Sequence, residues 1–142
     1  MQFDDYRRHD ALGLAALVRR GELSGQEVLE AALARLHAVN PVVNAVTYLH
    51  APALDPAHAP PPEGAPFAGV PYFIKDLHAP VQGMPLTQGC RLFEGQVFDF
   101  DAETVARLRR AGFRILGRTN TPEFGMNVST ERSEERRVGK EC

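Results

Sequence analysis

The stretch DAETVARLRRAGFRILG, residues 101–117, decides the fold class. Asp101 is a typical N-cap residue, and apolar residues recur on one face of a helix predicted over 102–111. Gly112 is placed to end that helix, and the apolar run 113–117 predicts a short strand. A helix, a tight glycine and a strand in this order indicate one αβ unit of a mixed or parallel sheet. We therefore expect an α/β protein with helices packed on a mixed sheet.

A second predicted strand lies upstream and ends in two charged residues. Tyr72 to Ile74 form a short apolar run that indicates a buried strand, and Lys75 and Asp76 follow directly. The ends of strands in open α/β sheets gather binding and catalytic groups. The alternative is that Lys75 pairs with an acid at a solvated edge, and the pattern favours neither interpretation.

The use of basic residues adds a second observation about Lys75. Of the 16 basic residues only Lys75 and Lys140 are lysine, and the other 14 are arginine. Arginine stays protonated at any accessible pH, whereas lysine can lose its proton. Codon usage alone would explain this bias, so the local sequence has to decide whether Lys75 is kept for its chemistry.

Two amphipathic helices are predicted at the start of the chain. The first spans 11–20 and is capped by Asp10. The second begins with the capping box of Ser24 and Glu27 and is expected to end before Asn40-Pro41, because a residue that precedes proline disfavours the helical conformation.

A strand over 42–49 and a proline-rich loop over 51–66 are expected next. The loop holds six of the 11 prolines, which lack a backbone donor and favour an extended surface segment. His50 and His58 flank it or lie in it without the spacing of a metal motif, so we interpret both as solvated loop residues.

Composition excludes several classes of function. A length of 142 residues is typical of one domain, and 44% hydrophobic with 24% charged residues is ordinary for a globular protein. The net charge of -2 indicates no nucleic-acid partner, and the longest apolar stretch, 11–18, is too short to cross a membrane. Two distant cysteines, Cys90 and Cys142, give no disulfide framework and no zinc site, and they favour a reducing, cytoplasmic location. Cys90 is interpreted as a small buried residue.

An ordered set of motifs in this chain resembles the N-terminal part of the amidase signature family. The set is GVP at 69–71 with KD at 75–76, GFRILGRTN at 112–120, PEFG at 122–125 and STE at 129–131. The resemblance covers about residues 5–131. The opening helices and the KDL variant look most like the branch that includes 6-aminohexanoate-cyclic-dimer hydrolases and related bacterial amidases. The A-type subunits of glutamyl-tRNA amidotransferases commonly carry KDN instead.

The resemblance implies a Ser–cis-Ser–Lys triad that hydrolyses amide bonds, with Lys75 at the position of the catalytic lysine. A neutral amine must accept the proton of the nucleophilic serine, which requires a poorly solvated surrounding, and arginine could not serve. Asp76 is expected to bond backbone or hydroxyl groups nearby. Arg118 stands where the family usually has lysine, which we interpret as a conservative change outside the chemistry. The resemblance implies no cofactor and no metal.

Both catalytic serines of the family motif are missing from this chain. Its serines are Ser24, Ser129 and Ser133, and the glycine- and serine-rich signature of the family would lie beyond residue 142. Residues 132–142 also depart from the family pattern and look like the translation of a sequencing-library adapter. We therefore interpret 1–131 as the N-terminal segment of an incomplete amidase domain and 132–142 as an artefactual tail. Adapter sequence in the source DNA from codon 132 would support this, and unbroken coding sequence there would refute it.

These observations predict the front part of an amidohydrolase that cleaves carboxamide C–N bonds of a small-molecule substrate in its full-length form. Without the serines and the oxyanion hole, this chain is expected to be inactive. One alternative is the A-type component of a glutamyl-tRNA amidotransferase, and another is a non-catalytic interaction module built on an amidase front half. The oligomeric state and the particular amide are not predicted.

Overall fold

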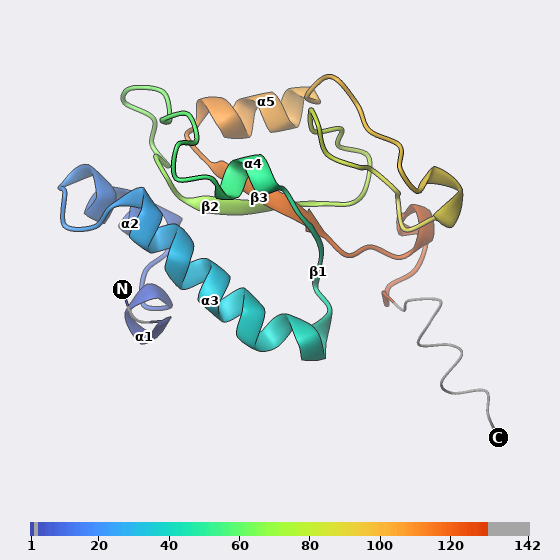
Figure 1. Cartoon of the computed structure of the whole chain (residues 1–142), viewed down its shortest axis with the longest axis horizontal. Coiled ribbons are helices and arrows are strands. Elements are labelled where there is room, and N and C mark those ends of the chain that lie inside the picture. Colours follow the sequence, from blue (N-terminus) through green and yellow to red (C-terminus); the bar gives the residue numbers. More distant parts are fainter. Residues whose placement is uncertain (2, 131–142) are drawn as a thin grey trace.

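The computed structural model describes Met1 and residues 3–130 as a small mixed sheet with helices on both faces (Figure 1). Its helices and strands are α1 (Phe3–Tyr6), α2 (Ala11–Arg19), α3 (Gly25–Val43), β1 (Val46–Leu49), α4 (Ala51–Leu54), β2 (Pro71–Lys75), α5 (Glu103–Arg110) and β3 (Arg114–Thr119), with short 3-10 turns η1 (Arg91–Phe93) and η2 (Glu123–Gly125). The expected tail, 132–142, lies outside the described residues.

The three strands form one sheet in the order β1-β3-β2. β2 and β3 run parallel and are joined through α5, as the αβ unit predicted, while β1 pairs antiparallel with β3. The mixed sheet with packed helices confirms the predicted α/β class. Because β2 and β3 are parallel, their carboxyl ends lie at the same edge of the sheet.

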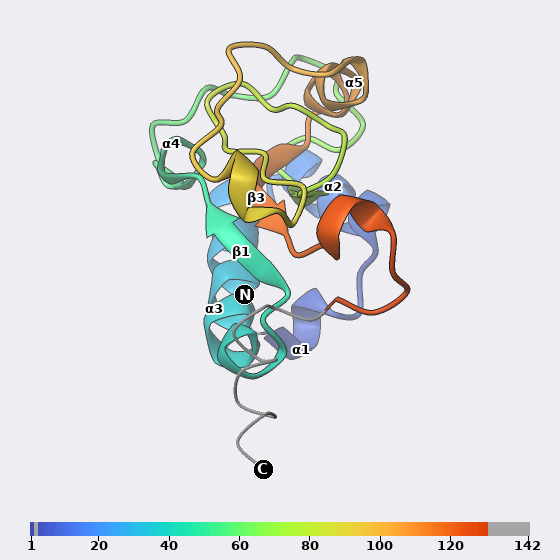
Figure 2. The ribbon, with the colours of Figure 1, turned by 90° about the vertical axis from the view of Figure 1, so that its right-hand side faces the viewer.

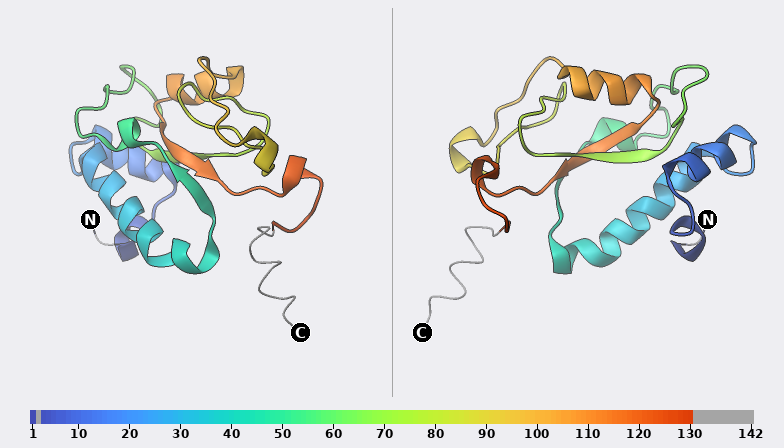
Figure 3. Two further views of the ribbon diagram at one scale, coloured as in Figure 1. Left: turned by 45° about the vertical axis from the view of Figure 1, so that its right-hand side comes forward. Right: turned by 180° about the vertical axis from the view of Figure 1, so that it is seen from behind.

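Neighbouring residues of β3 serve the two faces of the sheet. Ile115 packs with Ile74 and with Val105 of α5, whereas Leu116 packs with Leu29 of α3 on the opposite face. This is the alternation that a strand imposes on successive side chains. Figures 2 and 3 show the result, with α5 on one side of the sheet and α3 on the other.

The predicted caps of the first two long helices are confirmed. The Asp10 carboxylate accepts a hydrogen bond from the Gly13 amide at 2.7 Å. Ser24 and Glu27 form the reciprocal capping box at the start of α3.

The predicted end of α3 is wrong. The helix continues through Pro41 to Val43, so the strand expected over 42–49 is reduced to Val46–Leu49. Pro41 lies in the last turn, where its missing amide costs only one helical hydrogen bond. The Asn40 side chain then donates to the Val46 carbonyl and accepts from the Val46 amide, both at 2.8 Å, and so connects the helix end to β1.

The proline-rich segment is not extended throughout. Residues 51–54 form the short helix α4 with Pro52 in its first turn, where proline is tolerated, and Ala53 is buried against the α3 face of the sheet. His50 and His58 are half-buried rather than fully solvated. Burial lowers the pKa of each imidazole, with nearby positive charge adding to the effect.

Two predicted caps on the C-terminal side are also wrong. Asp101 does not cap α5, because its carboxylate instead accepts from the Gln82 amide and from Arg109 Nε, each at 2.8 Å. The sequence Thr121-Pro122 likewise predicts a capped helix start, with proline at the first helical position, but Thr121 caps no helix. Its hydroxyl donates to the Pro122 carbonyl at 3.1 Å, and only the 3-10 turn η2 follows.

Candidate active site at the carboxyl ends of β2 and β3

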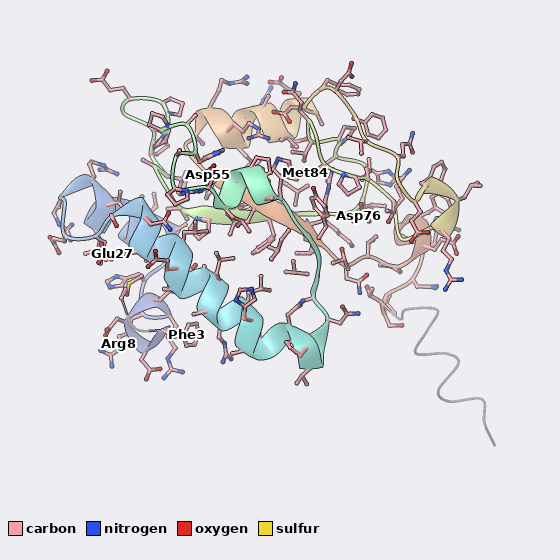
Figure 4. All side chains as sticks on the ribbon, in the orientation of Figure 1. Phe3, Arg8, Glu27, Asp55, Asp76 and Met84 are labelled. Atoms are coloured by element: carbon pink, nitrogen blue, oxygen red, sulfur yellow. The ribbon has the colours of Figure 1, made fainter. Side chains whose placement is uncertain are left out.

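The candidate site is a hollow of about 1000 Å³ at the carboxyl ends of the two parallel strands. The strand ends are joined there by a hydrogen bond from the Asp76 amide to the Thr119 carbonyl at 3.0 Å. Its walls come from β1, from the residues after β2 and β3, and from the loop around η1. The lining residues used below are Tyr48, Asp76, Thr87, Cys90, Arg118 and Ser129. In Figure 4, Asp76 lies at the end of the sheet away from Glu27, which marks the start of α3.

Asp76 is a buried carboxylate that binds the loop lying over it. One of its oxygens accepts from the Thr87 amide at 2.9 Å, and the other accepts from the Thr87 hydroxyl. The same hydroxyl accepts from the Gly89 amide at 3.2 Å. The expectation that Asp76 bonds backbone and hydroxyl groups is confirmed, and Asp76 holds the 87–89 segment against the end of β2.

Arg118 is the largest fully buried side chain of the described residues, with 1% of its surface exposed. Its Nε donates to the Pro85 carbonyl at 3.0 Å, and its Nη1 donates to the carbonyls of Ala79 at 2.7 Å and Lys75 at 3.4 Å. Its Nη2 is buried with no partner among the described residues. Burial lowers the pKa of the Arg118 guanidinium, and the charge of Asp76 opposes that shift.

Arg118, interpreted from the sequence as a conservative change outside the chemistry, has a structural role at the edge of the site that the sequence did not indicate. Three carbonyl acceptors, one at the end of β2 and two in the segment after it, converge on one guanidinium, so this residue organises the edge of the site. A basic residue directly after the apolar run 113–117 was the signal that could have indicated this role, since a charge is buried next to a strand core only when it is bonded there.

Lys75 lies at this same edge, but its side chain is exposed and does not line the hollow. Phe73 packs on the α3 face, and because side chains alternate along a strand, Lys75 emerges on that face too. The structure therefore brings Asp76, Thr87 and Arg118 together, and it ties Lys75 to them through its main-chain carbonyl. The predicted burial of β2 holds for Ile74 but not for Tyr72, which is 40% exposed.

The remaining sequence-predicted groups divide between the hollow and distant positions. Ser129 lines the hollow and is exposed, whereas Ser24 caps α3. Cys90 is half-buried, not buried, and a hydrogen bond with the Glu123 carboxylate raises the pKa of its thiol. Ser133 and Cys142 lie outside the described residues.

Met1 and residues 3–130 contain neither a membrane-spanning helix nor a metal cluster. No helix in that part of the chain is both long enough and apolar enough to cross a membrane. No group of three or more histidine, cysteine, aspartate or glutamate side chains there could hold a metal ion.

The fold and the site place this protein in the class of α/β proteins whose polar site residues collect at the carboxyl ends of parallel strands. The family model described as Amidase matches residues 27–137, and the chain belongs to this family.

Individual relatives agree with this assignment. The chain is 46% identical over 125 residues to a 6-aminohexanoate-cyclic-dimer hydrolase of Paenarthrobacter ureafaciens, covering 86% of this chain and 25% of the relative. It is 40% identical over 136 residues to the A-type subunit of the glutamyl-tRNA(Gln) amidotransferase of Acidothermus cellulolyticus, covering 91% of this chain and 27% of the relative. The solved structure of 6-aminohexanoate cyclic dimer hydrolase complexed with substrate superposes with a TM-score of 0.80 at 44% identity, covering 88% and 26% of the two chains. The chain thus spans about a quarter of the length of the relatives it matches.

Proposed function

We propose that this chain is the N-terminal part of a hydrolase of small carboxamides, in which Lys75 serves as the general base. This chain belongs to the Amidase family, and the observation that carries the proposal is the position of its Lys75. Lys75 is the last residue of β2, beside the parallel β3 and at the edge where the hollow opens. Catalytic groups of open α/β sheets collect at such strand ends.

In the proposed reaction the Lys75 amine accepts a proton from a nucleophilic serine through a second, bridging serine. The serine oxygen bonds to the carbonyl carbon, the C–N bond breaks, and the amine leaves with a proton returned through the same groups. Water then releases the acid from the acyl-enzyme. Both serines would come from chain beyond residue 142.

The exposure of Lys75 fits this division of the active site between two parts of the enzyme. Among the described residues β2 is paired only with β3, so the flank of β2 next to Lys75 is an open edge. A further segment placed against this edge would exclude water from the amine and favour its neutral form. The 142-residue chain by itself, without the two catalytic serines and the oxyanion hole, would then be inactive.

A hybrid enzyme tests the proposal. Residues 1–130 of this chain replace the matching quarter of the 6-aminohexanoate-cyclic-dimer hydrolase, and hydrolysis of the cyclic dimer is followed. Replacing Lys75 by Arg or Met removes the base, so kcat is expected to fall by about 10²–10⁴-fold. Arg19→Lys, an exchange of one cation for another on an exposed end of α2, is the matched control and leaves kcat unchanged. A Lys75→Arg hybrid as active as its parent would refute the role of Lys75.

The A-type component of a glutamyl-tRNA amidotransferase is the second candidate, supported by the 40% identity to such a protein. The sequence Lys75-Asp76-Leu77, in place of the KDN common in those proteins, favours the hydrolase. A second hybrid, in which residues 1–130 replace the matching part of the amidotransferase A-type subunit, separates the two candidates when its activity is compared with that of the hydrolase hybrid. Activity that appears only when the other components of an amidotransferase are added would favour the second candidate.

A further inference from the structure

We propose that Arg118 is a positioning residue that fixes the end of β2, and through it the main chain of Lys75. The proposal rests on the proposed function of Lys75. It assigns to Arg118 a role in the reaction that acts through the main chain of Lys75 and not through its side chain.

The first argument is the set of atoms that Arg118 holds. Its guanidinium donates to carbonyls of Lys75, Ala79 and Pro85, so that one planar group bonds the start, the middle and the far part of the segment that leaves β2. The donors of a guanidinium have a fixed relative geometry, and several acceptors held by one such group cannot move independently.

The second argument is that the held segment contains a strained turn directly after the lysine. His78 adopts a φ of 55°, a left-handed conformation that a non-glycine residue takes at an energetic cost. The hydrogen bond from Arg118 to Ala79 lies one residue after this turn, and the one to Lys75 lies three residues before His78. Arg118 therefore bridges the turn and opposes its relaxation.

The third argument is the cost of placing a cation there. Arg118 is fully buried, and it forms none of the ion pairs among residues 3–130. A buried charge is retained only where its hydrogen bonds offset its lost hydration. A buried apolar side chain would fill the same space at lower cost, so the hydrogen bonds to the segment are the distinctive contribution of Arg118.

Amide hydrogen exchange on the 142-residue chain tests the positioning directly. The Asp76 amide donates to Thr119 and the Leu77 amide donates to Lys75, so both report on the end of β2. In Arg118→Met these two amides are expected to exchange at least tenfold faster. The Arg114 amide, which donates to Val70 at the other end of the sheet, is the internal control and keeps its rate. Equal rates in parent and variant, or an equal rise at both ends, would overturn the proposal.

The hybrid enzyme gives the functional readout. Arg118→Met is expected to lower kcat at least tenfold with KM changed less than threefold, because the base is displaced while substrate contacts remain. Arg118→Lys, which keeps a buried cation and some of the donors, is expected to restore kcat to within threefold of the parent. An Arg118→Met hybrid with the kcat of its parent would overturn the positioning role even where Lys75→Arg abolishes activity. An active Lys75→Arg hybrid would instead refute the proposed function.

Discussion

Gly117 lies in the middle of β3, where the main chain of β1 comes closer than a side chain allows. A Cβ added there would lie 1.9 Å from the Tyr48 carbonyl oxygen. Gly117→Ala is therefore expected to separate β1 from β3 and to lower the free energy of unfolding by about 3 kcal/mol or more in urea denaturation. Gly64→Ala is the control, since its Cβ meets nothing within 4 Å and only the positive φ of 73° costs energy, about 1 kcal/mol. Equal losses in the two variants would contradict this account of the close strand contact.

Single residues also show what the sequence could and could not predict about the site. Although its partner Thr87 lies 11 residues further along the chain, the bonding of Asp76 was predictable, because a carboxylate at the end of an apolar strand needs hydrogen-bond donors. The three contacts of Arg118 were not, since its acceptors at residues 75, 79 and 85 are carbonyls, which carry no side-chain signal in the sequence. The exposure of Lys75 depends on which neighbours cover the edge of β2, and that is a property of the assembled sheet.

At the scale of elements, features that depend on neighbouring residues were predicted correctly from the sequence, and features that depend on partners further along the chain were not. The capping box of α3 and the α5–β3 unit are local and were predicted. The end of α3 was misplaced because Asn40 bonds Val46 across the turn and so compensates for the disruption by Pro41. Asp101 was assigned to a cap, but it has more distant donors in Gln82 and Arg109.

The segment that links β1 to the proline-rich loop should make stability depend on pH. Burial is the main cause that lowers the pKa of His50, and the charge of Arg109 adds to it. Burial is also the main cause that lowers the pKa of His58, and there the charge of Arg114 adds to it. Because the folded imidazoles bind protons less readily than the unfolded ones, their contribution is complete above about pH 6.5. It is lost as the pH falls through the lower, folded pKa.

Urea midpoints measured between pH 7.5 and 5 test this dependence. The parent is expected to lose stability on acidification, and His50→Asn with His58→Asn should flatten the curve over this range. His9→Asn, at an exposed position, is the control and should leave the curve of the parent unchanged. A midpoint that rises as the pH falls would have the opposite sign to that required by lowered histidine pKa values.

At the scale of the whole molecule, apolar side chains are exposed beside the hollow. Leu92 and Val97, on the loop that lines it, are 84% and 55% exposed. Such surface is typical of a face that another part of a protein covers, and an open strand edge adds unpaired backbone groups. If that cover belongs to the rest of an amidase, the 142-residue chain is expected to self-associate through this face.

Sedimentation velocity over a dilution series distinguishes this account from that of an independent interaction module. The parent should form concentration-dependent oligomers, and the Leu92→Lys, Val97→Lys double variant should raise the monomer fraction because charge opposes burial of the face. Leu12→Lys, at a 57% exposed apolar position on α2, is the matched control and should sediment like the parent. A parent chain that stays monomeric at every concentration and unfolds in one cooperative transition would instead describe a self-sufficient module. The exposed face would then be a surface for a partner, and the case for Lys75 as half of a divided catalytic centre would lose its structural support.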